Sequence, residues 1–173
     1  MYWYVIFVLT GREYKVEWFL KERLDADLFT PFIPLHECIF KKKGIVKKEV
    51  KPLFSSYVFI ESEMPGQEFI KSVSNIFRTS NDIIRLLKYS DTEIAMRESE
   101  RQALLSLSND DYCIESSTGI KEGSRIYITD GPLKGRESII KKVDRHKRKA
   151  WIEMEFMGEI RLVTVGLELV SKI

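Results

Sequence analysis

The chain has few of the residues that build disulfides, metal sites and acid–base catalysts: two cysteines and two histidines among 173 residues. Cys38 and Cys113 lie far apart, with neither Cys-x-x-Cys spacing nor a suitably spaced histidine, which argues against a disulfide framework and a zinc site. His36 and His146 lack a serine, cysteine or carboxylate arrangement that supports nucleophilic or general-base chemistry. We therefore expect no cofactor, no metal and no catalysis.

Long apolar runs are also missing, and no stretch approaches the ~20 residues that cross a bilayer. The apolar start, Tyr2 to Leu9, lacks the basic region and the small-residue cleavage site of a signal peptide, so it is typical of a strand. A glycine loop that cradles phosphates is absent, because Gly131 and Gly135 belong to a turn between strands. These absences predict a cytoplasmic protein with no membrane partner.

The chain has no strong net charge, but its charge is unevenly distributed. The total is +2, made up of −2 over residues 1–118 and +4 over residues 119–173. With 44% hydrophobic and 31% charged residues, the composition is that of a globular protein. A surface that attracts an anionic partner is therefore expected toward the C-terminus.

Local patterns at the N-terminus predict a strand followed by a helix. Aromatic and β-branched residues fill the run Tyr2 to Leu9, as in a buried strand. Thr10 and Glu13 have the spacing of a capping box, which predicts the start of a helix. The apolar face of this helix is formed by Val16, Phe19, Leu20 and Leu24.

The pattern changes to β between Ile33 and Ile60, where we expect an antiparallel meander of three strands over residues 33–40, 46–50 and 56–61. Pro65-Gly66 then opens a short amphipathic segment with Phe69, Ile70 and Val73, and residues 83–87 can form an edge strand. A second capping box, Ser90 to Glu93, predicts a helix that reaches Leu105. Strands and helices in this order predict an α+β domain in which helices cover one sheet.

The chain divides, in our interpretation, into a domain over residues 1–108, a linker over 109–118 and a second domain over 119–173. The linker is polar and turn-rich except for Tyr112, Cys113 and Ile114. After it, turn signals separate five short β-runs: residues 125–128, 138–143, 150–156, 160–165 and 169–170. So many short strands in some fifty residues predict a small closed barrel without exposed edges.

Three segments resemble parts of one known protein family: the start "WYVIFV", the later "PLFSSYVFIE", and "GSRIYITDGPLKGRESIIKKVD" over residues 123–144. The first two resemble the NGN domain, and the third resembles the KOW motif, of the NusG/Spt5 family of transcription elongation factors. Together and in this order they cover most of the chain. The resemblance implies an α+β fold, with an NGN-like antiparallel sheet flanked by helices and a C-terminal KOW domain that is an SH3-like β-barrel.

The resemblance also implies a polymerase-binding patch beside the Ser55-Ser56 turn. Phe54 and Tyr57 flank this turn and would line an exposed apolar patch that grips the clamp helices of RNA polymerase. Tyr4 and Phe77 would border the patch, whereas we interpret Phe59 as core.

A lysine-rich hairpin, "KKKGIVKKEVK", leaves two interpretations open. Lysines on a hairpin discourage edge-to-edge pairing of strands, and they also attract the phosphates of upstream DNA or RNA without reading bases. The lysines that would make this electrostatic contact are Lys41, Lys42, Lys43, Lys47 and Lys48.

A second basic cluster in the C-terminal domain favours RNA binding over a plain charged face. Its members are Lys134, Arg136, Lys141, Lys142, Arg145, His146, Lys147, Arg148, Lys149 and Arg161. Arg145 and Arg148 can reach guanine edges while the lysines hold phosphates. Because regular A-form RNA hides its major-groove edges, we expect a structured hairpin with a bulge, loop or widened groove as the ligand.

The chain resembles the antiterminator LoaP, a specialised paralog, more than it resembles housekeeping NusG. The short linker, the Ser55-Ser56 turn and the strongly basic barrel loop carry this resemblance. Ser138 replaces the second glycine of the KOW consensus, a departure that specialised paralogs such as RfaH share. The resemblance to LoaP implies an adapter that binds RNA polymerase and a nascent leader-RNA hairpin and promotes readthrough of terminators. The alternative is a general NusG factor whose KOW domain binds a ribosomal protein or Rho. A metal-dependent hydrolase using Asp130 and Asp144 is disfavoured, because two acids a whole strand apart make a poor metal cage. We expect a monomer.

Overall fold

A computed structural model describes residues 1–171, and its contacts divide the chain into two compact units. The first unit combines Met1–Pro34 with Phe54–Arg101, and the second combines Leu35–Leu53 with the chain from Gln102 onward. The predicted boundary near Ser108 had assigned residues 35–53 to the N-terminal domain. Two residues of the predicted C-terminal domain, 172 and 173, lie outside the described part of the chain.

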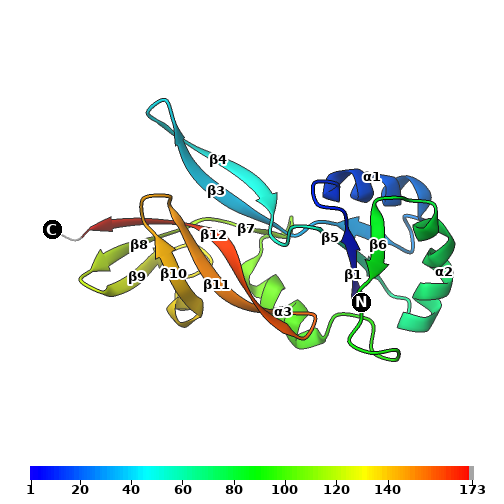
Figure 1. Cartoon of the computed structure of the whole chain (residues 1–173). Coiled ribbons are helices and arrows are strands. Elements are labelled where there is room, and N and C mark those ends of the chain that lie inside the picture. The colour runs from blue at the N-terminus through cyan, green and yellow to red at the C-terminus, as the bar shows by residue number, and fades with distance from the viewer. Residues whose placement is uncertain (172–173) are drawn as a thin grey trace. The chain divides into compact units, whose positions relative to one another are not determined.

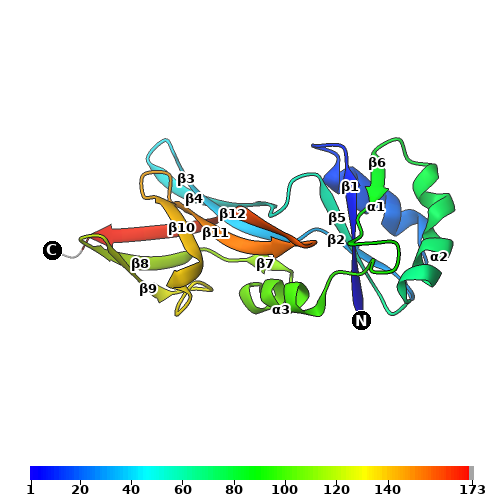
Figure 2. The same cartoon turned by 60° about the horizontal axis from the view of Figure 1, so that its bottom comes forward.

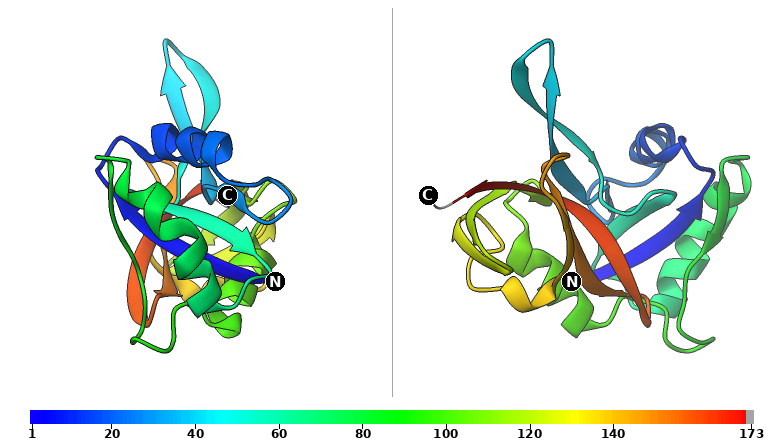
Figure 3. Two further views of the ribbon diagram at one scale, coloured as in Figure 1. Left: turned by 90° about the vertical axis from the view of Figure 1, so that its right-hand side faces the viewer. Right: turned by 60° about the vertical axis from the view of Figure 1, so that its left-hand side comes forward.

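The first unit is built on a four-stranded sheet of order β2-β5-β1-β6 (Figure 1). Its strands are β1 (Tyr2–Val8), β2 (Thr30–Phe32), β5 (Tyr57–Ser62) and β6 (Ile83–Leu86). Helices α1 (Glu13–Arg23) and α2 (Gly66–Arg78) lie on the same side of this sheet (Figure 3). The predicted edge strand is confirmed as β6. The predicted meander is wrong, because β5 pairs with β1 and β2 and has no neighbour from the lysine-rich hairpin.

Aromatic side chains fill both faces of this sheet. On the helical face, the ring of Tyr4 stacks on Phe69 of α2 with centroids 3.7 Å apart. On the other face, Trp3 meets Phe32 and Phe59 edge-on at 5.0 and 6.0 Å. All but Phe32 are completely buried, and their size makes them large contributors to the apolar burial of the unit. The expectation that Phe59 is a core residue is confirmed.

The first predicted capping box does not form. Helix α1 has Arg12 at its N-cap and no side-chain capping bond. Thr10 instead places its Oγ1 2.6 Å from Ser56 Oγ. The Glu13 carboxylate accepts hydrogen bonds from the backbone N–H groups of Gly11 and Ser56, both at 3.0 Å. The two residues that we predicted to cap a helix therefore hold the turn at Ser56, 46 residues from Thr10 and 43 residues from Glu13.

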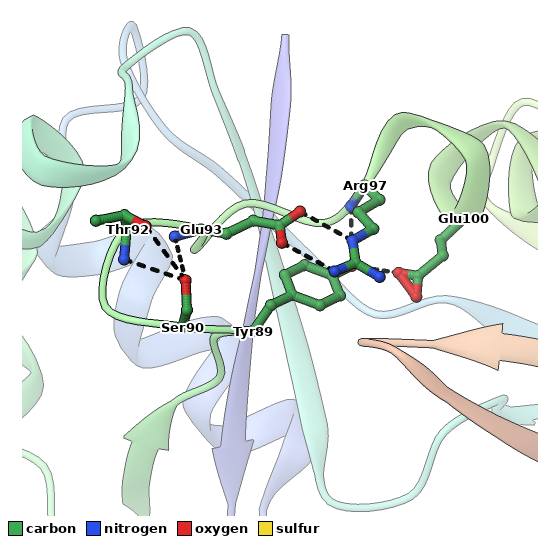
Figure 4. Close-up of polar contacts among 6 residues, drawn as sticks. All are labelled: Tyr89, Ser90, Thr92, Glu93, Arg97 and Glu100. Atoms are coloured by element: carbon green, nitrogen blue, oxygen red, sulfur yellow. Dashed lines mark hydrogen bonds and ion pairs between the residues drawn. The ribbon is translucent and has the colours of Figure 1, made fainter.

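The second predicted capping box forms a turn instead of a helix (Figure 4). Ser90 Oγ accepts the backbone N–H of Glu93 at 3.0 Å, as predicted, but α3 (Glu98–Leu107) begins only five residues later. Glu93 uses its carboxylate on Arg97, with bonds of 2.8 and 2.9 Å. The backbone N–H of Met96 donates to the carbonyl of Trp3 at 2.7 Å, so the segment before α3 runs beside β1 and cannot coil.

The second unit contains two sheets, one of order β4-β3-β7 and one of order β10-β11-β12-β8-β9 (Figure 2). The first is formed by β3 (Leu35–Lys42), β4 (Ile45–Pro52) and β7 (Cys113–Ile114). The second is formed by β8 (Ser117–Glu122), β9 (Arg125–Asp130), β10 (Ile140–Asp144), β11 (Lys149–Phe156) and β12 (Glu159–Ser171), with the short 3-10 helix η1 (Glu137–Ile139) before β10. A five-stranded sheet agrees with the mixed α+β class, whereas closure into an SH3-like barrel stays a prediction.

Part of the predicted linker is structural. Cys113 and Ile114 are buried and pair in parallel with β3, which explains why residues 35–53 group with the C-terminal region. Burial raises the pKa of the Cys113 thiol to about 11. The apolar residues of the predicted linker thus pack as a strand, because removing their side chains from water is favourable.

Strand β12 merges two predicted runs, because Gly166 does not form the predicted turn. A Cβ added there would lie 2.9 Å from Ser116 Cβ and 3.0 Å from the Glu37 carbonyl oxygen. Because glycine has no Cβ, the backbones at Ser116 and Glu37 can both pack closely against β12 while the strand continues through Gly166. The second half of β12 pairs in parallel with β8, a strand that the sequence patterns did not predict.

Within residues 1–171, the helices are too short and too polar to cross a membrane.

Candidate protein and nucleic-acid interfaces

The Ser55-Ser56 turn of the first unit does not expose the aromatic pair that we predicted. Phe54 is only 6% exposed and stacks on Phe59 with centroids 6.1 Å apart, and Tyr4 is fully buried. Ser56 is also buried, with a positive φ of 74° that Glu13 and Thr10 help to hold. The prediction that Phe54 and Tyr4 line an exposed patch is therefore wrong, because the chain reverses direction with Phe54 folded inward.

The accessible aromatic pair is Phe7 with Tyr57. These residues are direct partners in the β1–β5 register, both are half-buried, and their ring centroids are 5.4 Å apart. Arg85 of β6 is the partner of Phe7 on the other side, and its guanidinium lies 5.9 Å from the Phe7 ring. The sequence patterns missed Phe7, whose position at the end of an apolar strand looked like core.

Phe77 belongs to a different surface of the first unit. It is half-buried on α2, edge-on to Phe69 at 6.5 Å, and so lies on the helical side of the sheet. It lines a cavity of about 470 Å³ between α2 and β6, together with Ile70 and Val73. Because Phe7 and Tyr57 project from the opposite face of the sheet, the four aromatics predicted as one site do not form one patch.

In the second unit, a tight turn between β10 and β11 presents the cations that we predicted to bind RNA. Arg145, His146 and Lys147 are exposed, whereas Arg148 is half-buried with a positive φ of 54°. The Asp144 carboxylate accepts the backbone N–H of Lys147 at 2.9 Å, and this bond lowers the pKa of Asp144. The turn is therefore ordered by backbone contacts, which leave its exposed side chains available to a ligand.

The β3–β4 hairpin lies beside the β10–β11 turn (Figures 1 and 2). Residues of both segments line a cavity of about 1150 Å³. Its lining comprises Ile39, Phe40, Lys41, Gly44, Arg145, His146, Lys147, Arg148, Glu168 and Leu169. We call this cavity the cationic cleft. Two basic segments that are a hundred residues apart in the sequence thus share one concave surface.

The other lysines of the hairpin are not part of the lining of the cationic cleft. Lys42, Lys43, Lys47 and Lys48 are all exposed. Strand β4 is an edge strand, and every residue from Ile45 to Lys51 is exposed. Its lysines can serve both interpretations left open above, because an edge rich in lysine resists strand pairing and also attracts phosphate.

Trp151 adds an aromatic ring beside the β10–β11 turn. It is half-buried on β11, and the ammonium groups of Lys142 and Lys149 lie 4.8 and 4.9 Å from its ring centroid. An accessible ring between two cations suits a nucleic acid, since bases stack on aromatics while cations hold phosphates. The alternation of β11 could have indicated Trp151, because its neighbours Ala150 and Ile152 are buried on the other face.

Four members of the predicted RNA surface are engaged elsewhere or lie apart. Arg136 donates to Ser106 Oγ at 2.7 Å, and Lys141 lies 3.8 Å from the Glu153 carboxylate. Arg161 contacts Glu159 at 3.5 Å and the Phe156 ring at 4.7 Å, near the opposite end of the β11–β12 pair from Lys149. Lys134 is exposed in the β9–β10 connection. The predicted cluster is therefore a compact group around residues 145–149 and a dispersed remainder.

The histidine and cysteine of β3 form no recognisable reaction centre. His36 is buried, with Nδ1 3.7 Å from Cys38 Sγ, and burial lowers the pKa of the imidazole. Burial likewise raises the pKa of the Cys38 thiol, which disfavours the reactive thiolate. Among the residues described, no three His, Cys, Asp or Glu side chains come together as metal ligands.

The fold and the surface together define an α+β protein of two units. The first unit is rich in aromatic residues, and the second is rich in β-strands and carries the cationic cleft. Residues 1–105 match the family described as "Transcription termination factor nusG". The chain belongs to the NusG family of transcription termination and antitermination factors. Membership in a family of transcription factors agrees with the expectation of a non-enzymatic protein.

Relatives and solved structures extend the similarity over nearly the whole chain. The NusG protein of Borreliella burgdorferi is 22% identical over 99% of this chain and 98% of its own. That of Streptococcus pyogenes serotype M1 is 25% identical over 95% of this chain and 94% of its own. A Thermotoga maritima NusG structure, "Domain interaction in Thermotoga maritima NusG", superposes with a TM-score of 0.54 at 18% identity, covering 96% of this chain and 93% of its own. This last likeness supports the fold.

Proposed function

We propose that this chain is a specialised, LoaP-like antitermination factor that binds RNA polymerase through its first unit and a nascent leader-RNA hairpin through its second. The cationic cleft carries the proposal: three exposed cationic or imidazole side chains of one turn face Lys41 of a lysine hairpin. An adapter of this kind needs no catalysis. Its two modest affinities reinforce each other, because RNA binding raises the local concentration of the first unit at the polymerase.

In the proposed RNA contact, some side chains hold the phosphate backbone and others recognise bases. Lysines hold phosphates as point charges, whereas the planar guanidinium of Arg145 can donate two parallel bonds to a guanine edge. Trp151, between Lys142 and Lys149, offers a ring on which an unpaired base can stack. A structured RNA with unpaired nucleotides fits these groups better than a regular helix.

The polymerase contact is assigned to Phe7 and Tyr57, with Arg85 beside them. Partly exposed aromatic rings with an adjoining guanidinium suit the side of a protein helix, since such residues dominate protein interfaces. Phe54 and Tyr4 support this surface from inside the fold. The clamp helices of the polymerase are the proposed partner, as the family resemblance implies.

The predicted division into domains 1–108 and 119–173 and the closed KOW barrel remain part of the proposal. Upstream DNA is a further proposed contact of the exposed β4 lysines, which can attract any phosphate backbone.

RNA binding is tested with the full chain and a series of fluorescein-labelled leader-RNA hairpins, by anisotropy over a range of salt concentrations. If phosphates dominate the contact, the logarithm of affinity falls with the logarithm of salt by roughly 0.7–0.9 per phosphate neutralised. Binding of no hairpin at low salt would refute the RNA part of the proposal.

A second candidate is a general NusG factor whose C-terminal unit binds a protein, either a ribosomal protein or Rho. One observation favours it: Ile160 and Leu162 of β12 are 67% and 56% exposed, on the strand that pairs with β11. Exposed apolar side chains on a sheet are typical of a protein interface. Salt-insensitive capture of a purified ribosomal protein or Rho, lost in Leu162→Ser, would support this candidate.

A further inference from the structure

We propose that the cationic cleft is a single composite RNA site, in which the β3–β4 hairpin and the β10–β11 turn bind the same RNA and an unpaired base enters between them. This inference rests on the RNA-binding function proposed above and specifies its ligand. It reassigns Lys41 of the hairpin from a separate DNA contact to the RNA site.

The size of the cleft fits an extruded nucleotide. Its volume of about 1150 Å³ is slightly above the roughly 300–1,000 Å³ of pockets that enclose small molecules. A base with its sugar and flanking phosphates therefore has room, whereas a duplex must remain outside. The two walls come from β3 and from the β10–β11 turn, so a nucleotide between them touches both.

The chemistry of the lining separates a phosphate region from a base region. Lys41 stands on one wall, and Arg145, Lys147 and Arg148 stand on the other, so both walls attract the sugar–phosphate backbone. The lining also includes three apolar residues, Ile39, Phe40 and Leu169. An apolar surface with a half-buried phenyl ring favours the flat face of a base.

Among the described residues that line the cleft, Glu168 is the one carboxylate, and it indicates which bases fit. It is half-buried on β12, where its partner in β8 is Thr118. A carboxylate repels phosphate and accepts hydrogen bonds from exocyclic amines, as glutamate does from the amine of cytosine. Adenine, cytosine and guanine carry such an amine and uracil does not, so we expect uracil to be disfavoured at the unpaired position.

The experiment uses the full chain and five fluorescein-labelled stem-loops that share one stem. Four contain a single unpaired A, C, G or U, and the fifth is fully paired. Anisotropy titrations at low salt give the dissociation constants, and circular dichroism confirms that each variant is folded. The expected result is that the stem-loops with an A, C or G bulge bind about tenfold more tightly than the fully paired stem. The affinity of the stem-loop with a U bulge should lie between these two values.

Three variants test the parts of the cleft separately. Lys41→Ala is expected to weaken every stem-loop and to reduce the salt slope by roughly 0.7–0.9. Phe40→Leu keeps an apolar side chain but removes the ring, and is expected to cancel most of the advantage of the bulge. Glu168→Gln is expected to abolish discrimination against U without weakening binding overall. Lys134→Ala, an exposed cation outside the cleft, is the matched control.

The outcomes distinguish failure of this inference from failure of the proposed function. If Arg145→Ala weakens binding while Lys41→Ala and Phe40→Leu do not, RNA binding stands and the composite site is overturned. Equal affinity for bulged and paired stems would also overturn it. If Glu168→Gln still discriminates against the U bulge, the proposed recognition of the base by Glu168 is overturned. If none of the five stem-loops nor any leader RNA binds, the proposed function fails as well.

Discussion

The carboxylate of Glu13 at the start of α1 accepts the backbone N–H of Ser56 at 3.0 Å, across 43 residues of sequence. Glu13 is 6% exposed, yet its charge is compensated by two backbone donors, from Gly11 and Ser56. A buried charge is tolerated where hydrogen bonds replace its water. This contact fixes the turn that precedes Tyr57 and so connects the stability of the first unit to its proposed polymerase surface.

Replacing Glu13 is therefore expected to destabilise the first unit. Glu13→Ala leaves two donors without their partner and lowers the free energy of unfolding by about 1–3 kcal/mol. Chemical denaturation followed by circular dichroism measures the loss. Glu22→Ala, an exposed position on the same helix, is the control and should change stability little. Equal stability of the two variants would show that the Glu13 contacts contribute nothing.

Substitutions of aromatic residues in the first unit are expected to affect either polymerase binding or stability, depending on whether the ring is accessible or buried. Tyr57→Ala and Phe7→Ala remove half-buried rings, and are expected to weaken association with RNA polymerase while the unit stays folded. Phe54→Ala empties a buried site and is expected to cost about 3–5 kcal/mol of stability. Co-sedimentation with polymerase and thermal unfolding are measured for each variant, with Tyr127→Ala in the second unit as the control. Full polymerase binding by the double variant of Phe7 and Tyr57 would contradict the assigned surface.

Cations of the β10–β11 turn are expected to differ in how they tolerate substitution. Arg145→Ala should weaken hairpin binding by about 1–3 kcal/mol and relax its sequence preference, if the guanidinium makes a bidentate contact. Arg148 has a positive φ, so Arg148→Gly removes its charge without the backbone strain that alanine would add. Arg136→Ala, which lies outside the cleft, is the matched control for loss of a guanidinium. Polymerase association should be unchanged in all three, and a parallel loss of RNA and polymerase binding would contradict the division of labour.

The burial of His36 predicts a pH dependence of stability. Its pKa is lowered from 6.5 by burial, so the unfolded chain binds a proton more readily than the folded chain as pH falls below this value. Stability attributable to the neutral imidazole is present above pH 6.5 and is lost as pH falls through the window below it, by at most about 1.4 kcal/mol per pH unit. Unfolding midpoints at pH 7.5 and pH 5.5, two values about one unit either side of the ordinary histidine pKa, are compared for the wild type and His36→Gln. The wild type should lose more stability than the variant, and an identical loss would exclude His36 as the cause.

Several elements were predictable because their signal is local. The apolar run Tyr2 to Leu9 became β1, and the segment after Pro65 became α2, since side-chain periodicity matches one backbone conformation. The basic turn at residues 145–149 was equally visible, because charges cluster there in consecutive positions. The helix starts predicted from the two capping boxes were wrong, because the Glu13 carboxylate bonds to the backbone of Ser56 and the Glu93 carboxylate bonds to Arg97.

The amino-acid sequence by itself determined the alternation of strands and helices, the family, and the identity of the basic segments, since each depends on neighbours in the chain. Only the tertiary structure decided which aromatics reach the surface, because exposure depends on what packs above a residue: Phe54 turned inward while Phe7 stayed accessible. It also decided that Lys41 and Arg145 line one cleft. Pairing of β3 with β7 brings the hairpin into the second unit, and no local pattern encodes a contact between residues so distant along the chain.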